Sequence, residues 1–378
     1  MKLLTILLFL FPMLAQVQAQ PKEILYVGTY STRGSEGIYV YSFDRKTGAL
    51  ERLQGITQGK SPSFLAVHPS GRFLYAVNEG DQQGENKSGT VSAYRIDPAT
   101  GKLTYINQQS SHGGAPCHIS IDKTGKLAFI SNYSGGSLTM LPIAADGSLG
   151  TETDHVQHNG SGANKSRQEK PHVHSAILSP DERFVYVSDL GTDKVYIYEI
   201  DKAKGKLKPA QTPHVSVAPG SGPRHFTIHP NGKYAYLVEE IISAVASFSR
   251  DSKTGALTLM QDQVKALKDE FDPKNSGADI HTDPMGRYLY ESIRGKHLLA
   301  IFSIGNDGKI QLIGQQDTQG KTPRNFLVDD RGEFVLAANQ DSDNVVVFKL
   351  EAKTGKLTPT GTEIKVPAPV CLKMLTLK

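Results

Sequence analysis

Short runs of hydrophobic and polar positions recur along the chain after residue 20 and predict a series of β-hairpins. Each copy has a run rich in β-branched and aromatic residues, a tight turn that usually ends in Gly, and a second such run. Six copies can be aligned: PSFLAVHPSGRFLYAVNE (62–79), PCHISIDKTGKLAFISNY (116–133), VHSAILSPDERFVYVSDL (173–190), PRHFTIHPNGKYAYLVEE (223–240), GADIHTDPMGRYLYESIR (277–294) and PRNFLVDDRGEFVLAANQ (323–340).

A third run and a further turn follow every hairpin, as in GTVSAYRIDPATGKL after the first copy and DNVVVFKLEAKTGKL after the last. A seventh copy of this part, GIYVYSFDRKTGAL (37–50), precedes them all. Each unit therefore holds four strands in roughly 50 residues, which is the length of one β-propeller blade.

The two ends of the chain complete the seventh unit. Residues 24–30 (ILYVGTY) resemble the second strand of a hairpin, and residues 370–377 (VCLKMLTL) resemble a first strand. A ring closed in this way leaves no open edge. We therefore predict an all-β fold, a seven-bladed β-propeller of four-stranded antiparallel blades closed by both termini, in one domain over residues 20–378. Two stacked β-sandwiches would not explain seven equivalent units.

The first 19 residues have a different pattern. A short basic start is followed by an apolar run over residues 3–14 and by Val17-Gln18-Ala19, with small residues two places apart. This pattern is typical of a secretory signal peptide, and the run is shorter than the ~20 residues that span a membrane. We expect cleavage after Ala19 and a periplasmic or secreted mature protein without a membrane anchor. The alternative is a buried first strand or helix.

Composition narrows the possible partners. The formal net charge is +4, from 42 basic and 38 acidic residues, which is too small and too scattered to indicate nucleic-acid binding. It permits a weak preference for anionic small molecules. The only cysteines, Cys117 and Cys371, lie far apart in the sequence and do not form a disulfide framework. We expect a monomer.

Two segments interrupt the repeat, GDQQGENKSG (80–89) and HNGSGANKSRQEKP (158–171). Both are rich in Gly, Asn, Ser and Lys and are expected to be surface loops. They are either tolerated insertions or a lid over a functional site.

One end of each hairpin distinguishes the copies. The first strand of a blade lines the channel, so its start and the end of the second strand lie at the same mouth. Equivalent positions in a repeat protein share a structural task, and departures need another explanation. At this end of the hairpins most copies have small or amide residues. The residues that differ from this norm are His174, Arg224, Arg324, Glu239, Glu240 and Arg294.

The expected strand register is accurate to about one residue and places Arg224 opposite Glu239 and His174 opposite Asp189. Either pair could be purely structural. As a set, however, arginines, glutamates and a histidine around one opening would attract an anionic ligand and supply a proton acceptor. This suits the addition of water to an ester or lactone carbonyl, with arginines stabilising the oxyanion.

Other chemistries have little support in the sequence. There is no G-x-S-x-G motif, and Cys117 has no evident activating neighbour. His172 and His174 form an H-x-H pair without a carboxylate ligand set, and the glycines lie at turns rather than in phosphate-binding loops. We therefore expect neither a metal nor another cofactor.

The hairpins beginning HVHS (172–175), GSGPRHFTIHPNGKYAYLVEE (220–240), GADIHTDPMGRYLY (277–290) and GKTPRNFLVDDRGEF (320–334), with YVGTY and SEGIYVYSFD, resemble the bacterial seven-bladed lactonase family. That family includes a 6-phosphogluconolactonase and is similar to the fungal carboxy-cis,cis-muconate lactonising enzyme. The resemblance covers nearly all of the chain after the expected signal peptide.

The resemblance implies metal-free hydrolysis of a sugar δ-lactone, such as a gluconolactone, with an anionic or polyhydroxylated lactone as substrate. It places the catalytic positions at His174, Arg224, Glu240 and Arg294. Our own mechanistic hypothesis is that Glu240 or His174 is the base that activates water, while Arg224 and Arg294 bind the lactone. We expect the substrate to contact residues around them: His118, His172, His225, Glu239 and Arg324.

Two residues depart from the family pattern. Glu239 stands where Asn is common, and Ile293 stands where a polar residue is usual. A second carboxylate in the mouth would disfavour a phosphorylated substrate, and export would favour an extracytoplasmic lactone. The alternatives are an exported propeller that binds a glycan or protein through the segments 80–89 and 158–171, and a cyclase acting on a muconate-like diacid.

Overall fold

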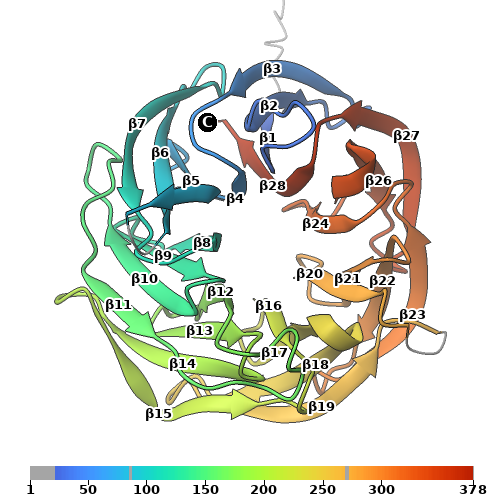
Figure 1. Cartoon of the computed structure of the whole chain (residues 1–378). Coiled ribbons are helices and arrows are strands. Elements are labelled where there is room, and N and C mark those ends of the chain that lie inside the picture. The colour runs from blue at the N-terminus through green and yellow to red at the C-terminus, as the bar shows by residue number, and fades with distance from the viewer. Residues whose placement is uncertain (1–21, 85–86, 269–271, 378) are drawn as a thin grey trace, which may run out of the picture.

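The computed structural model describes residues 22–84, 87–268 and 272–377, and this part of the chain forms the expected seven-bladed propeller (Figure 1). Seven four-stranded antiparallel sheets surround a central channel. The expected signal peptide, residues 1–19, lies outside the described residues. Among the described residues, the helical segments are two single turns of 3-10 helix, η1 (Glu240–Ile242) and η2 (Gln340–Ser342), and no helix is long and apolar enough to cross a membrane.

Each blade contributes one strand to each of four layers around the channel; we number blades 1 to 6 in chain order and assign the closing blade number 7. The innermost strands of blades 1 to 7 are β4 (Pro62–Val67), β8 (Pro116–Ile121), β12 (Val173–Leu178), β16 (Pro223–Ile228), β20 (Ser276–Thr282), β24 (Pro323–Val328) and β28 (Pro369–Thr376). The second strands are β5 (Phe73–Gln83), β9 (Leu127–Asn132), β13 (Phe184–Asp189), β17 (Tyr234–Glu239), β21 (Tyr288–Arg294), β25 (Phe334–Asn339) and β1 (Glu23–Thr29).

The third strands are β6 (Ser88–Ile96), β10 (Ser137–Pro142), β14 (Lys194–Asp201), β18 (Ala244–Arg250), β22 (Leu298–Ile304), β26 (Asn344–Leu350) and β2 (Ile38–Phe43). The outermost strands are β7 (Leu103–Ser110), β11 (Asp154–Gln157), β15 (Lys206–Ser216), β19 (Leu257–Lys265), β23 (Ile310–Asp317), β27 (Leu357–Lys365) and β3 (Leu50–Ile56).

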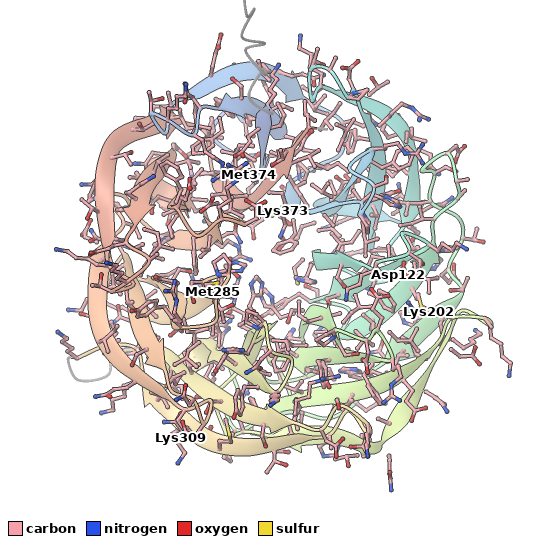
Figure 2. All side chains as sticks on the ribbon, turned by 180° about the vertical axis from the view of Figure 1, so that it is seen from behind. Asp122, Lys202, Met285, Lys309, Lys373 and Met374 are labelled. Atoms are coloured by element: carbon pink, nitrogen blue, oxygen red, sulfur yellow. The ribbon has the colours of Figure 1, made fainter. Side chains whose placement is uncertain are left out.

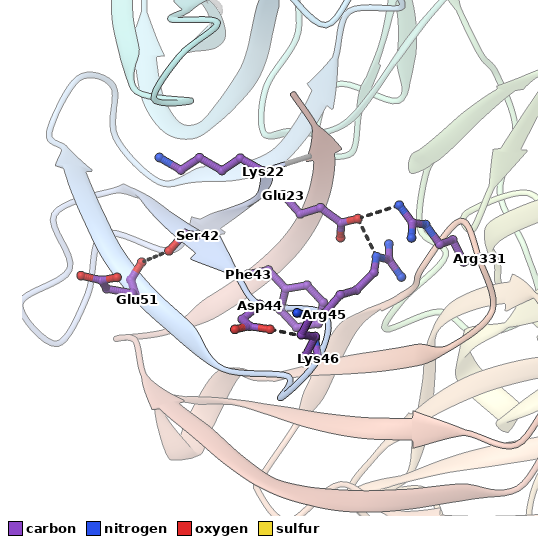
Figure 3. Close-up of a pocket in the computed structure, with 9 residues that line it drawn as sticks. All are labelled: Lys22, Glu23, Ser42, Phe43, Asp44, Arg45, Lys46, Glu51 and Arg331. Carbon is purple, nitrogen blue, oxygen red and sulfur yellow. Dashed lines mark hydrogen bonds and ion pairs between the residues drawn. The ribbon is translucent and has the colours of Figure 1, made fainter. Parts of the chain in front are cut away.

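Blade 7 joins the two ends of the described chain. Strand β28 pairs with β1 from Glu23 opposite Thr376 to Thr29 opposite Pro369, and β2 and β3 complete the sheet. A cavity of about 420 Å³ lies beside this blade. In it, Glu23 contacts Arg45 of the same blade and Arg331 of blade 6 (Figure 3). Arg45 also contacts the buried Asp329. These ion pairs fasten the closing blade to its neighbour.

The core lies between adjacent blades, where the two middle strands of each sheet are almost fully buried. A buried tyrosine hydroxyl donates a hydrogen bond to a turn glycine carbonyl of the next blade at five of the seven seams. The pairs are Tyr26–Gly101, Tyr75–Gly147, Tyr186–Gly255, Tyr236–Gly308 and Tyr290–Gly355. Glycine is required in such a turn: Gly308 has φ +78°, and a Cβ there would lie 2.3 Å from the Tyr234 ring. The repeated hairpins thus interlock through one recurring contact.

Every innermost strand contains a β-bulge near the same mouth of the channel. In blade 1, Pro62 pairs with Asn78 and Phe64 with Val77, so Ser63 has no partner. The expected pairings of Arg224 with Glu239 and of His174 with Asp189 are likewise one residue out of register, because Pro223 and Val173 take these partners. The other extra residues are Cys117, His174, Arg324 and Val370, and one residue within each of Arg224–His225 and Ala278–Asp279. A bulge redirects a side chain without ending the sheet.

The opposite face of the disc is seen in Figure 2. There, Lys202 bridges Asp122 and Glu182 at 3.4 Å and 2.5 Å. Lys373 of β28 lies beside the channel, with its ammonium 4.8 Å from the centre of the Phe64 ring. This face therefore carries paired charges between blades, and the charged departures identified in the sequence lie elsewhere.

Candidate active site

A cavity of about 260 Å³ lies at the mouth where the bulges occur, and all seven blades contribute to it. Its lining residues are Tyr30, Glu79, Cys117, Tyr133, Arg167, His174, Glu240, Arg294 and Arg324. A second cavity of about 10 Å³ shares Glu79, Cys117 and Arg324 with the first. It is also lined by Phe64 and His225, which follow the bulge positions, so it lies deeper in the channel. We call the larger cavity the mouth pocket and the smaller one the inner cavity.

Glu240 is the electrostatic centre of the mouth pocket. It opens η1 directly after β17 and is buried. Three arginines surround its carboxylate: Arg167 donates to Oε1 at 2.6 Å, while Arg224 Nε and Arg294 Nη2 lie 2.8 and 3.3 Å from Oε2. Burial opposes ionisation, but the charges of Arg294, Arg224 and Arg167 outweigh it and hold the pKa of Glu240 well below its usual range. Glu240 is therefore a carboxylate at every physiological pH.

The backbone of blade 5 holds two of these arginines in place. Arg224 is 1 % exposed and donates from Nη1 to the carbonyl of Ala278. Arg294 donates from Nη2 to the carbonyl of Gly277 at 2.9 Å. Burial, together with the charges of Arg324 and Arg294, lowers the pKa of Arg224 to about 10, so the guanidinium stays charged at neutral pH. The pocket thus presents fixed positive charge.

His174 is the bulge residue of blade 3 and lies beside Cys117, with 3.8 Å between Nδ1 and Sγ. Its ring packs edge-to-face against Tyr133 and His225, at 5.5 and 5.3 Å between ring centres. Burial and the charge of Arg224 hold the pKa of His174 well below its usual value, so its imidazole is neutral. The pair of His174 with Asp189 that the sequence suggested does not form, because the Asp189 carboxylate contacts His158 at 2.8 Å.

The Cys117 thiol is buried, and burial raises its pKa far above the ordinary value. A nucleophilic cysteine needs the opposite shift. Cys117 therefore contributes to the wall of the pocket as a neutral thiol.

Three other histidines named from the sequence lie around the pocket. The His118 ring packs at a tilt against Phe64, with 4.5 Å between ring centres, farther along the inner strand. His225 lines the inner cavity and contacts Asp279 at 2.6 Å. His172 stacks on Tyr133 at 4.5 Å and supports this aromatic wall from behind. Direct contact with the mouth pocket is therefore confined, among these four histidines, to His174.

Glu239 does not line the mouth pocket, although it precedes Glu240. Consecutive strand residues face opposite sides of a sheet, and Glu239 points into the blade. It accepts a hydrogen bond from the Gln263 amide at 3.1 Å, and burial, with the nearby charge of Asp262, raises its pKa. The expected pair of Arg224 with Glu239 therefore does not form, and Arg224 pairs with Glu240 instead. The argument that Glu239 disfavours a phosphorylated substrate no longer applies.

Arg167 belongs to the second insertion and was not singled out from the sequence. The next residue, Gln168, is fully buried and donates to the Leu190 carbonyl at 2.8 Å and to Asp193 at 2.6 Å. The segment 158–171 is therefore tied down beside the pocket and delivers one arginine into it. The first insertion differs from the expected loop, since β5 and β6 extend into it and pair Gln83 with Ser88.

Glu79 was also missed, although the aligned hairpins contained the signal. It ends the first copy at the position that Glu240 occupies in the fourth. The mouth pocket and inner cavity together contain Arg167, Arg224, Arg294 and Arg324 against Glu79 and Glu240. This excess of arginine suits an anionic ligand. No group of three or more His, Cys, Asp or Glu among the described residues could hold a metal ion.

The chain is similar in sequence and fold to known proteins. Residues 24–374 match the family model described as a lactonase with a seven-bladed β-propeller. A 6-phosphogluconolactonase of Bacillus subtilis is 36 % identical, over 94 % of this chain and 99 % of the relative. Another from Formosa agariphila is 35 % identical, over 93 % and 99 %. The structure of a Pseudomonas aeruginosa periplasmic gluconolactonase superposes with a TM-score of 0.86 at 32 % identity, over 94 % of this chain and all of that one.

Proposed function

The chain belongs to the seven-bladed β-propeller lactonase family, and we propose that it hydrolyses a sugar δ-lactone in the mouth pocket. The observation that carries this proposal is that Glu240 joins Arg294, which lines the mouth pocket with it, to Arg224, which lines the adjoining inner cavity. Fixed guanidinium groups can bind the lactone carbonyl and stabilise the oxyanion that forms when water attacks it.

From the sequence, either His174 or Glu240 could be the base that activates water. A carboxylate held by three arginines is a weak proton acceptor, because protonation would leave those charges without their partner. We assign Glu240 the task of fixing the arginines around the reacting carbonyl. Neutral His174 can donate or accept a hydrogen bond at the substrate.

We further propose that the substrate is an anionic sugar lactone. The two cavities contain four arginines and two glutamates, and Glu239 adds no charge to them. Arg167 reaches the pocket from the outside and is the arginine best placed for a substituent remote from the lactone carbonyl. Several relatives carry the name 6-phosphogluconolactonase, which is consistent with a phosphate at this end. We place the reaction outside the cytoplasm on the basis of the signal-peptide pattern, as for the periplasmic relative.

A direct assay tests the proposal. Protein comprising residues 20–378 is incubated with glucono-δ-lactone and with 6-phosphoglucono-δ-lactone, and acid release is followed by pH-stat. We expect hydrolysis above the spontaneous rate for at least one lactone and a lower KM for the phosphorylated one. Failure to hydrolyse any lactone in a wider panel would refute the proposal.

The same experiment separates the alternatives. A muconate-type cyclase would form a lactone from a diacid, and chromatography of the products would reveal it. A non-catalytic propeller would bind a glycan or protein with no turnover of any lactone. Each outcome replaces hydrolysis with a different class of function.

A further inference from the structure

Two carboxylates face the mouth pocket from well-separated blades. Glu240 belongs to blade 4, and Glu79 belongs to blade 1, three blades away in the ring of seven. Their surroundings differ. Glu240 is bound by three arginines, whereas the Glu79 carboxylate accepts, among the described residues, one hydrogen bond, from the Tyr30 hydroxyl to Oε1 at 3.5 Å. Two carboxylates held in such different environments are typical of sites that divide their tasks.

The second oxygen of Glu79 is free to accept a proton. Oε2 is buried and has no hydrogen-bond partner among the described residues. Glu79 interacts electrostatically with Tyr30, Cys117 and Arg324, which come from blades 7, 2 and 6. Arg324 is stacked over the Tyr30 ring at 5.4 Å. Glu79 thus has the Arg324 guanidinium nearby, and within the described part of the chain the two form no direct ion pair.

Glu79 also lies between the two cavities. It lines the mouth pocket and the inner cavity, and the inner cavity has a volume of about 10 Å³, close to the space needed for one water molecule. One other atom on the wall of the inner cavity, Ser63 Oγ, is buried without a hydrogen-bond partner among the described residues. Orphan polar atoms around a space of this size indicate a bound water.

We propose that Glu79 is the general base of the lactonase, which takes the proton from a water held in the inner cavity. This inference rests on the proposed lactone hydrolysis. The water oxygen bonds to the lactone carbonyl carbon as its proton moves to Glu79, and the carbonyl electron pair moves onto the oxygen bound by the arginines. When the carbonyl re-forms, the bond to the ring oxygen breaks. Glu79 returns the proton to that oxygen, which gives the open hydroxy acid.

The pH profiles of matched variants test this role. In the wild type, kcat/KM should fall at low pH as the base becomes protonated. Glu79→Gln should lower kcat by about 10²- to 10³-fold and abolish this acidic limb, because general bases contribute about 10²–10⁴-fold. Glu240→Gln should mainly raise KM and keep the limb. The surface variant Glu51→Gln should behave as the wild type, and circular dichroism should confirm that all variants are folded.

Chemical rescue gives a second readout. Formate should restore part of the rate of Glu79→Ala by replacing the missing base, and it should not restore Glu240→Ala. If Glu79→Gln keeps its acidic limb and loses less than about 5-fold in kcat while the wild type is active, the role of Glu79 is refuted. If the wild type hydrolyses no lactone, the proposed function itself fails.

Discussion

Glu239 and Glu240 are consecutive in the chain, yet their carboxylates occupy opposite electrostatic environments. Glu239 lies inside blade 4, where burial and Asp262 raise its pKa. Burial, with the charge of Glu239, also raises the pKa of Glu291 in blade 5. Glu240 faces the mouth pocket among three arginines, which lower its pKa. Because the two side chains point to opposite sides of the sheet, the Glu239 carboxyl resists ionisation while that of Glu240 is always ionised.

Replacing Glu239 should make the protein less sensitive to alkaline pH. A buried acid with a raised pKa keeps its proton in the folded state, so its stabilising contribution is complete below pH ~4.3 and is lost as pH rises through the folded pKa. Glu239→Asn introduces the residue found at the equivalent positions 78, 132 and 339. We expect it to raise the free energy of unfolding by about 1–3 kcal/mol at pH 8.5.

Urea unfolding at pH 5, 7 and 8.5 measures this effect. Little difference between Glu239→Asn and the wild type is expected at pH 5, where both forms of the site are neutral. The exposed Glu51→Gln serves as the control, and its stability should follow that of the wild type at each pH. An unchanged pH slope in Glu239→Asn would contradict the raised pKa.

Replacing Glu240 should have the opposite dependence on pH. Its lowered pKa stabilises the folded state above the unfolded pKa, and this contribution is lost as pH falls. In Glu240→Gln, Arg224 and Arg294 lose their shared carboxylate while they remain buried. We expect destabilisation of about 3 kcal/mol at pH 7, with a smaller difference at pH 4, measured by urea unfolding. Equal stability of the two proteins at pH 7 would argue against a tight arginine cluster.

Arg167 should contribute to substrate affinity rather than to the chemical step. Arg167→Ala removes a charge from the outer side of the pocket, and we expect KM for an anionic lactone to rise about 10-fold with a smaller change in kcat. Gln168→Ala should act in the same direction, because Gln168 fixes the segment that carries Arg167. Steady-state kinetics would measure both, with the exposed Lys165→Ala as control. Equal KM values for all four proteins would exclude this role.

The tyrosine contacts between blades should each stabilise the ring. Tyr236→Phe removes the hydrogen bond to Gly308 and leaves a buried carbonyl without its partner. A loss of about 1 kcal/mol in the free energy of unfolding is expected in guanidinium denaturation. Tyr105, which is 42 % exposed, provides a control, since Tyr105→Phe should change stability very little. A similar loss in both variants would show that the contact is not specific.

The fold followed from the sequence because each blade repeats the same local signals, and seven copies reinforce one another. The register did not follow in full. Counting outward from each turn placed Arg224 opposite Glu239, whereas the bulge inserts one residue and shifts the start of the inner strand. An extra residue in a strand leaves no mark in the pattern of hydrophobic positions, since both flanking segments keep their alternation.

The candidate site was only partly visible for a similar reason. His174, Arg224 and Glu240 stood out because they differ from equivalent residues in other blades, and the structure brings all three to one mouth. Arg167 lies outside the repeat, so no equivalent positions exist for comparison. Its place depends on contacts of Gln168 with residues more than twenty positions away, which local sequence patterns do not encode.

The seven bulges also make the propeller a natural scaffold for redesign. Residues such as Ser63, Cys117 and Val370 stand outside the strand ladder, so their replacement leaves the pairing of the neighbouring residues in place. Each blade thus offers one position at which a library could vary the walls of a single cavity while the ring stays constant. New specificities could be selected in this protein by changing a handful of codons, one per blade.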